Sequence, residues 1–286
     1  MESPMISVLM PAYNAMPLIK ASVKSLLLQT YSDWECVIVD DGSTDGTSEY
    51  LDSLQDSRFV VHHFPLNQGR PAARQKTLEL ARGKYICMLD AGDLYARNTL
   101  QVLLTKMGTY SDAVLVSANM CSFGTHTPIL RKRGATSEQV FIYNGSIRPN
   151  HASSILIADR AKKYKYNPAL KLGQDQDFLA RYLANAKLVL IPHVLYYYSE
   201  FDSVTKKKIR KAHLINAKQY FRSGNYILCL KRALKYVYAS LIYPFFSIEK
   251  IISTRGLPLD EENKRSFQDE IKPIIEMALQ NPEDNE

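Results

Sequence analysis

Short apolar runs alternate with longer amphipathic segments over the first 120 residues. The apolar runs keep hydrophobic side chains on successive positions, as strands do when helices cover both faces of a sheet. They are Ile6–Met10, Cys36–Val39, Phe59–His62, Tyr85–Leu89 and Ala113–Val116. The segments with helical spacing are Leu18–Gln29, Gly46–Leu54, Ala72–Ala81 and Asn98–Met107. This alternation predicts an α/β fold with a mostly parallel sheet flanked by helices.

The rest of the chain changes character twice. Residues 121–150 are irregular, and they precede a predicted helix at Gln174–Ala186 and a predicted strand at Leu188–Tyr198. Two further helices follow, Lys206–Arg222 and Tyr226–Phe246, which Ser223-Gly224-Asn225 separates. We expect a main domain at 1–205 and, at 206–286, a basic helical extension that ends in an acidic tail.

Charge gathers in this extension. The chain has 286 residues, of which 46% are apolar and 23% charged, so disordered and collagen-like classes are excluded. Residues 206–255 contain twelve Lys or Arg and one acid, whereas residues 256–286 contain three basic and nine acidic residues. A basic block on a nearly neutral body predicts one electropositive surface.

The four cysteines, Cys36, Cys87, Cys121 and Cys229, lie far apart without a C-x-x-C spacing. This distribution argues against a zinc site or a disulfide framework and favours a reducing compartment. The first residues lack the basic region and cleavage site of a signal peptide. The longest apolar stretches have about half of the roughly 20 residues that a spanning helix needs. We therefore expect a cytoplasmic protein that does not cross a membrane.

Polar motifs follow the predicted strands at the edge where parallel sheets bind ligands. The first is Pro11-Ala12-Tyr13-Asn14, in place of the glycine-rich loop of a dinucleotide-binding protein. A simple turn with an exposed aromatic ring is the alternative.

The second motif is Asp40-Asp41-Gly42-Ser43-Thr44-Asp45. Adjacent carboxylates repel each other unless a donor or cation shares them. The spacing does not fit the D-x-D-G-T of haloacid dehalogenases. A calcium loop starting at Asp41 lacks the entering helix and the glutamate at position twelve. A helix start with Ser43 or Asp45 as N-cap stays open beside a ligand role.

Together these motifs resemble the nucleotide-sugar-binding half of family 2 glycosyltransferases, which have the GT-A fold. Three more matches follow in the family's order. Asn67-Gln68-Gly69 with Arg74 is similar to N-x-G-x-x-x-A-R, Asp90-Ala91-Gly92-Asp93 occupies the place of the D-x-D motif, and Gln174–Arg181 is similar to E-D-x-D-L-x-x-R. The resemblance covers residues 5–205 and leaves the helical extension outside.

The resemblance implies a site for a nucleoside-diphosphate sugar. Its residues would be Pro11, Ala12, Tyr13, Asn14, Asp41, Gly69, Arg74, Asp90 and Ala91. Tyr13 would stack on the nucleobase and Asp41 would accept its imide N–H, which favours uracil. A salt bridge from Arg74 to Asp41 or Asp90 is the alternative to ligand binding by Arg74.

The family's general base corresponds to Asp175, which would deprotonate the acceptor hydroxyl and lead to inversion at the anomeric carbon. Gln174, in place of the commoner glutamate, and His151 would lie on the acceptor side. Alternatively, Asp175 and Asp177 are first-turn acids that complement the helix dipole, an interpretation favoured for Asp177.

Gly92 departs from the family pattern. The third residue of D-A-D-D is the carboxylate that holds Mn²⁺ or Mg²⁺ on the diphosphate, and here it is glycine. Asp90 and Asp93 are the remaining candidate metal ligands. Cationic side chains neutralising the leaving group are the alternative.

The sequence thus predicts an inverting glycosyltransferase that uses a nucleoside-diphosphate sugar, most readily a UDP-sugar. The acceptor would be a glycan or lipid-linked intermediate in cell-surface polysaccharide biosynthesis. The basic helices at 206–255 would contact an anionic membrane surface from the cytoplasmic side, or else their aromatic residues pack on the main domain. Nucleic-acid binding is not expected. The rival hypotheses are a nucleotide-sugar-binding scaffold without turnover and a peripheral membrane adaptor.

Overall fold

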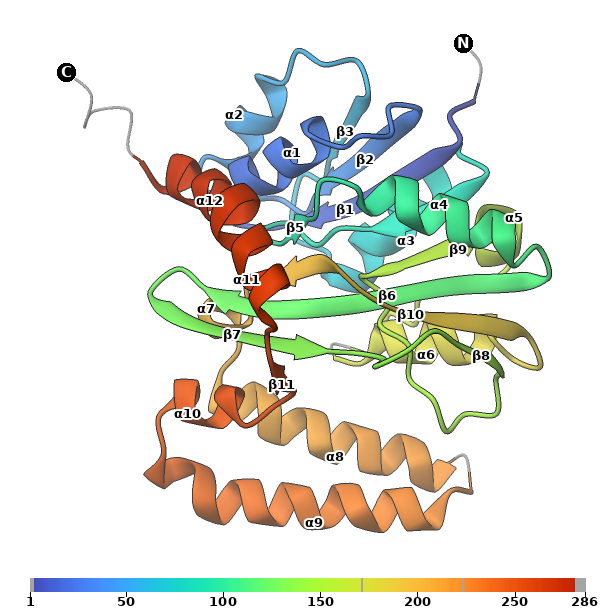
Figure 1. Ribbon diagram of the computed structural model, residues 1–286, viewed down its shortest axis with the longest axis vertical. Helices are drawn as coiled ribbons and strands as arrows, with labels where there is room; N and C mark the ends of the chain where they lie inside the picture. The colour runs from blue at the N-terminus through green and yellow to red at the C-terminus, as the bar shows by residue number, and fades with distance from the viewer. Residues whose placement is uncertain (1–2, 171, 223, 281–286) are drawn as a thin grey trace.

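The computed structural model describes residues 3–170, 172–222 and 224–280. One mixed sheet runs through the molecule in the order β11-β7-β6-β9-β4-β1-β2-β3, and β10 joins it beside β6 (Figure 1). The sheet confirms the α/β class, with its layers of helices on both faces.

The N-terminal half of the sheet is parallel, as predicted. It contains β1 (Ile6–Ala12), β2 (Trp34–Asp40), β3 (Phe59–His63) and β4 (Tyr85–Met88). The connecting helices are α1 (Ile19–Leu27), α2 (Thr47–Asp52) and α3 (Arg70–Leu80). Every residue of β1 and β2 is buried, which explains why their sequences are mostly apolar, with Ser7, Glu35 and Asp40 as the polar exceptions.

Beyond β4 the sheet is mostly antiparallel, and here the sequence prediction was incomplete. The elements are β5 (Leu94–Tyr95), α4 (Thr99–Thr109), β6 (Ala113–Gly124), β7 (Thr127–Arg133), β8 (Gln139–Ile142), β9 (Ser154–Ile157), α5 (Ala158–Ala161), α6 (Gln174–Tyr182), β10 (Lys187–Tyr198) and α7 (Glu200–Ser203). The irregular segment after residue 120 continues β6, turns into β7 and adds β8. Only β10 runs parallel to β6.

The C-terminal part leaves the sheet and returns to it. A hairpin of α8 (Lys206–Arg222) and α9 (Tyr226–Ile242) lies below the sheet in Figure 1. The chain then forms η1 (Tyr243–Phe245), α10 (Ile248–Ser253), β11 (Leu257–Pro258), α11 (Glu261–Ser266), η2 (Phe267–Ile271) and α12 (Lys272–Leu279). Ser223, in the predicted break, and the acidic tail 281–286 lie outside the described residues.

The last helices complete the core of the main body. The Phe267 ring centroid lies 6.0 Å from that of Phe123 on β6 and 5.7 Å from that of Tyr197 on β10. Ile271, Ile274 and Ala278 belong to the same buried cluster, and α12 packs against α1. The predicted boundary at 205/206 stays a prediction, and the structure adds that the chain re-enters the core after Pro258. Within the described ranges, no helix combines the length and apolar character needed to span a bilayer.

A buried ion cluster holds the two ends of the helical excursion together. The carboxylate of Glu200, only 1% exposed, accepts hydrogen bonds from Ser122 Oγ at 2.6 Å and Arg133 Nη2 at 2.7 Å. Arg255, which follows α10, pairs with the other carboxylate oxygen. A carboxylate tolerates this burial because cations and donors surround it.

We expect Glu200→Ala to lower the free energy of unfolding by about 3–5 kcal/mol, because two arginines lose a buried partner. Urea denaturation measures this change. Glu261→Ala is the control, since Glu261 pairs with Lys264 at 2.6 Å on the exposed surface. Equal costs for the two substitutions would contradict the role of the Glu200 cluster.

Candidate active site

A hollow of about 310 Å³ opens at the carboxyl ends of β1, β2 and β4. Its lining residues are Pro11, Ala12, Tyr13, Asp41, Asn67, Gly69, Arg70, Ala73, Asp90 and Ala91. Seven of the residues predicted to bind a nucleotide sugar are therefore together around one space. Asn14 and Arg74, also predicted, are adjacent to it but not part of its lining.

Asp41 shapes one wall of this pocket. Its Oδ1 accepts a hydrogen bond from Gln68 N at 2.6 Å and its Oδ2 from Gly69 N at 2.9 Å. Gly42 permits the approach, because with φ at +71° a Cβ there would lie 2.8 Å from the Leu66 and Asn67 backbone. Each carboxylate oxygen keeps a second lone pair, so the predicted contact with a nucleobase stays a prediction.

Asn14 has a structural task. Its Oδ1 accepts from Thr44 N at 2.9 Å, and its own backbone N–H donates to Ser43 Oγ at 2.9 Å. These bonds join the end of β1 to the loop after β2. The prediction that Asn14 contacts the ligand stays a prediction, and its amide oxygen is used within the loop.

The other acidic side chains of the second motif also serve the fold. Asp40 accepts hydrogen bonds from Ser43, Ser48 and His63. The predicted N-cap was wrong by one residue for Asp45 and by three for Ser43, because α2 has Gly46 as its N-cap. Asp45 instead receives Thr47 N at 3.1 Å and Met16 N at 3.0 Å.

A buried ion pair forms the floor behind the pocket. Arg74 Nη2 lies 2.8 Å from Asp90 Oδ1 and 2.9 Å from Oδ2. Burial by itself would raise the pKa of Asp90, but the charges of Arg74 and Arg70 outweigh it and hold that pKa at about 2. Of the two interpretations of Arg74, the structure supports the salt bridge to Asp90.

Gly92 and Asp93 both form hydrogen bonds within the fold. Gly92 has φ of +98°, which side chains rarely adopt, and its N–H donates to Ser22 Oγ at 2.9 Å. The buried Asp93 carboxylate accepts from Tyr196 Oη at 2.6 Å, Ser199 N at 2.9 Å and Ser199 Oγ at 3.0 Å. Asp93 contacts Tyr196 and Ser199 and does not line the pocket, so these contacts give no support to its predicted role as a metal ligand, which stays a prediction.

The donor set does not suit a metal held by side chains alone. No three His, Cys, Asp or Glu side chains converge as metal ligands anywhere in the described part of the chain. Asp90 lines the pocket, but Arg74 already neutralises its charge.

Asp175 and His151 lie close enough to the Arg74–Asp90 pair to interact with it electrostatically. Asp175 lies in the first turn of α6, directly after Gln174. Burial disfavours the charged form of Arg74, but Asp90, Tyr166 and Asp175 together raise its pKa. Burial and the Arg74 charge lower the pKa of His151 to about 4, and Asp175 and Asp90 offset only part of this effect. His151 is therefore neutral at pH 7.

Unpaired polar atoms gather at this junction. Arg74 Nε, His151 Nδ1 and Gln174 Oε1 are buried without a hydrogen-bond partner among the described residues. The half-buried Asp175 carboxylate likewise has no hydrogen bond or ion pair within that part of the chain. Asp177, two residues on, forms an ion pair with Arg181 at 2.7 Å, as its structural interpretation predicted. Buried polar groups without partners are rare, and they mark places where a ligand can supply the bond.

Sequence reasoning did not single out Arg70, which lines the pocket as the first residue of α3. Its position directly after Gly69 was a usable signal. It also overlooked Tyr166, which stacks on Phe178 at 4.5 Å and donates or accepts a 3.3 Å hydrogen bond with His151 Nε2. Tyr166 stands in a loop without periodicity, so no local pattern indicated its contact.

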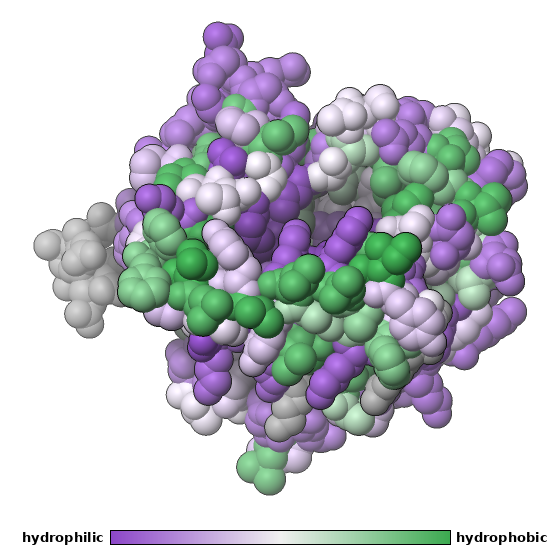
Figure 2. Space-filling view, turned by 90° about the horizontal axis from the view of Figure 1, so that it is seen from below, coloured by the Kyte–Doolittle hydropathy of each residue, from purple (hydrophilic) through white to green (hydrophobic). Residues whose placement is uncertain are grey.

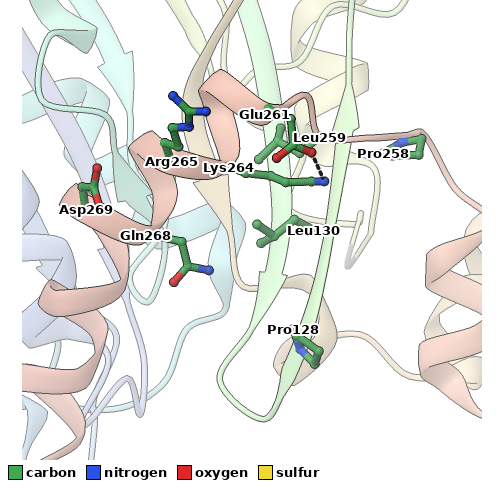
Figure 3. Close-up of a pocket in the computed structure, with 9 residues that line it drawn as sticks. All are labelled: Pro128, Leu130, Pro258, Leu259, Glu261, Lys264, Arg265, Gln268 and Asp269. Atoms are coloured by element: carbon green, nitrogen blue, oxygen red, sulfur yellow. Dashed lines mark hydrogen bonds and ion pairs between the residues drawn. The ribbon is translucent and has the colours of Figure 1, made fainter.

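A second hollow, of about 360 Å³, lies between β7 and the β11–α11 segment (Figure 3). Its charged groups include the ion pair between Glu261 and Lys264 that Figure 3 marks. It contains none of the motif residues, so the strand-end pocket is the candidate active site.

The fold and the pocket place the protein in the GT-A class of nucleotide-diphospho-sugar transferases. The profile for "Glycosyl transferase family 2" matches residues 7–162, more than half of the chain. The chain therefore belongs to glycosyltransferase family 2.

Among curated relatives, the putative colanic acid biosynthesis glycosyl transferase WcaA of Escherichia coli is 32% identical over 189 residues, or 63% of this chain and 66% of that protein. The UDP-Glc:alpha-D-GlcNAc-diphosphoundecaprenol beta-1,3-glucosyltransferase WfgD of Escherichia coli is 36% identical over 107 residues, 37% of this chain and 42% of that protein. The matches thus span less than two thirds of these relatives.

Solved structures share the fold at low sequence identity. S. aureus TarS 1–349 in complex with UDP-GlcNAc is 18% identical with a TM-score of 0.64, covering 87% of this chain and 78% of that one. The mannosyltransferase PcManGT from Pyrobaculum calidifontis, in complex with GDP-Man and Mn²⁺, is 15% identical with a TM-score of 0.61, covering 100% of this chain and 89% of that one. These likenesses establish the GT-A fold.

Burial and the nearby Asp90 raise the pKa of Asp93 to about 7, although Tyr196 and Ser199 lower it in part. The folded protein then binds a proton that the unfolded chain releases near pH 4, so stability falls as the pH rises from about 4 to about 7. We expect Asp93→Asn to remove up to about 4 kcal/mol of this fall. Urea denaturation across that range measures it, and parallel pH profiles for both proteins would contradict the assignment.

Proposed function

We propose that the protein transfers a sugar from a UDP-sugar, with inversion, to a hydroxyl of a glycan or lipid-linked acceptor in cell-surface polysaccharide biosynthesis. The observation that carries this proposal is the Asp175 carboxylate, which has no hydrogen bond or ion pair among the described residues and acts electrostatically on Arg74, the partner of the pocket residue Asp90.

The pocket suits a nucleoside diphosphate. Tyr13 is 51% exposed and presents a flat ring beside Ala12, where a nucleobase can stack. Asp41 keeps lone pairs for an imide N–H of uracil. The UDP-GlcNAc in the TarS title and the UDP-glucose in the WfgD name support the choice of a uridine nucleotide.

In the proposed reaction, Asp175 accepts the proton of the acceptor hydroxyl. The resulting oxygen nucleophile attacks the anomeric carbon, a new C–O bond forms, and the bond from that carbon to the diphosphate oxygen breaks with its electron pair on the leaving nucleotide. Direct displacement inverts the anomeric centre. Neutral His151 and Gln174 would orient the acceptor through Nδ1 and Oε1, the atoms that lack partners.

We further propose that Arg70 supplies positive charge to the diphosphate. Arg70 is exposed at the pocket, lies at the N-terminus of the eleven-residue α3 and acts electrostatically on Asp90. The helix dipole reinforces this charge. The Mn²⁺ of PcManGT belongs to that protein, and here Gly92 and the orientation of Asp93 argue that the donor binds without a metal.

The acceptor of a related enzyme favours a function at a membrane surface. The name of WfgD specifies a diphosphoundecaprenol acceptor, a lipid carrier. We propose that this protein likewise acts peripherally at an anionic membrane surface on its cytoplasmic side. The second candidate function is a nucleotide-sugar-binding scaffold without turnover, which the glycine at position 92 favours.

Replacing the base distinguishes transferase from scaffold. We expect Asp175→Asn to lower transfer by about 10²- to 10⁴-fold with nucleotide affinity kept, because the amide cannot take the proton. The assay is sugar transfer from a panel of UDP-sugars, with UDP binding followed in parallel.

Asp177→Asn is the matched control, since it removes a carboxylate of the same helix that pairs only with Arg181. It should transfer at the normal rate. Unchanged transfer by Asp175→Asn would refute the base, and no transfer by the unsubstituted protein with any donor would favour the scaffold.

UDP at about 100 times its dissociation constant should add about 2.7 kcal/mol of stability, seen as a raised melting temperature. We expect the same rise with Mn²⁺ and with EDTA.

Arg70→Gln should weaken UDP binding about tenfold, since it removes a charge-assisted contact. Lys76→Gln, on the same helix and outside the pocket lining, is the control. A rise that requires Mn²⁺ would show that a metal does what we assign to Arg70.

A further inference from the structure

The outer face of α9 is apolar although it faces solvent. Leucine and isoleucine recur at helical spacing along it: Ile227 is 72% exposed, Leu230 61%, Leu234 60% and Leu241 65%. Val237 and Tyr238 lie on the same stripe, and Phe245 after the helix is 82% exposed. Figure 2 shows apolar side chains forming a band across this side of the molecule, with hydrophilic side chains along both edges.

This arrangement reverses that of an ordinary surface helix, whose apolar stripe faces the core. On α9 the side facing α8 holds smaller or mixed residues, such as the buried Ala239 and the half-buried Arg232. Of the aromatic residues expected to pack on the main domain, Tyr238 and Phe245 are 58% and 82% exposed, so these two do not support that alternative. Contiguous exposed apolar surface of this kind marks an interaction site.

Positive charge surrounds the stripe. Lys231 and Lys235 are exposed and directly follow Leu230 and Leu234 of the stripe. Helix α8 adds the exposed Lys207, Lys211 and Lys218. The same positive charge acts on His213 of α8, because burial and the charges of Arg232, Lys235 and Arg255 lower its pKa. The whole segment 206–255 contains twelve basic residues and one acid. Two copies of such a face would repel each other, whereas an anionic surface attracts it.

We propose that α9 lies in the headgroup region of an anionic lipid bilayer, with Ile227, Leu230 and Leu234 inserted and the flanking lysines on the lipid phosphates. A helix with an apolar face and basic edges has the composition of an interfacial helix. This inference deepens the proposed function, because it names the surface that carries the lipid-linked acceptor.

The hairpin is also coupled to the acceptor side of the site. Arg148 Nη1 donates to Asn216 Oδ1 on α8 at 2.8 Å, and its guanidinium lies 4.2 Å above the Tyr220 ring. The adjacent Pro149 O accepts from Gln176 Nε2 at 3.3 Å, on the helix that bears Asp175. Contact of α9 with a bilayer therefore places the membrane on the side where the acceptor is expected to enter.

Vesicle flotation of the full chain tests the inference. We expect it to float with phosphatidylcholine vesicles that contain phosphatidylglycerol and to remain unbound with phosphatidylcholine alone. Leu230→Ser with Leu234→Ser should reduce flotation about tenfold or more, as should Lys231→Glu with Lys235→Glu. The matched control is Ile142→Ser with Leu257→Ser, because these side chains are 62% and 57% exposed on other faces.

The possible outcomes separate the two proposals. Failure of the unsubstituted protein to float, or equal flotation of the Leu230/Leu234 and control variants, would overturn the membrane inference. A dimer in sedimentation that Leu230→Ser with Leu234→Ser dissociates, without flotation, would show a second copy on α9 and also overturn it. UDP binding, measured on the same samples, tests the nucleotide site independently. Its loss with flotation intact would count against the proposed transfer alone.

Discussion

The candidate site depends on how carboxylates are kept at the buried ends of strands. A carboxylate taken out of water must have donors or a cation beside it, or it takes up a proton. Asp41 has two backbone N–H groups, Asp90 has Arg74, and Asp93 has Tyr196 and Ser199. Each arrangement ties the end of a strand to another part of the chain. Asp175, next to the Arg74–Asp90 pair, has no such partner among the described residues.

The arginine beside Asp90 changes what this pocket can offer a ligand. A metal-binding D-x-D motif presents negative charge that a divalent ion overcompensates. Here the pair of Arg74 and Asp90 is neutral, and Gly92 adds no carboxylate. The positive charge among the lining residues then comes from Arg70. The electrostatics of the pocket therefore come from fixed side chains.

Local patterns in the sequence were enough for the parallel half of the fold and for most of the pocket. The strands β1, β2 and β4 are mostly apolar on successive positions because they are buried, and the motifs at their ends meet at one edge by topology. The contacts of the Asp93 side chain could not be predicted in the same way. Asp93 binds Tyr196 and Ser199, more than a hundred residues away.

The antiparallel half illustrates the same limit. β7 and β8 carry mixed polar and apolar residues because they are half exposed, so periodicity gave little signal. The direction of the α9 stripe was also not readable, because a three-four spacing of apolar residues is the same whether that face meets a core or the solvent. The packing of α8 against α9 decides which face of α9 meets the solvent.

The return of the chain to the core gives the helical hairpin the character of an insertion. The polypeptide leaves the main body after α7 and re-enters it at β11, and the Glu200 cluster joins the two crossing points. A protein cut after residue 205 would lose Phe267, Ile271 and Ala278 from its interior. The outer face of α9, by contrast, is exposed, whereas α8 buries Ile209, Ala217 and Tyr220. Sequence change on this outer face can therefore occur without disturbing the core that positions the pocket.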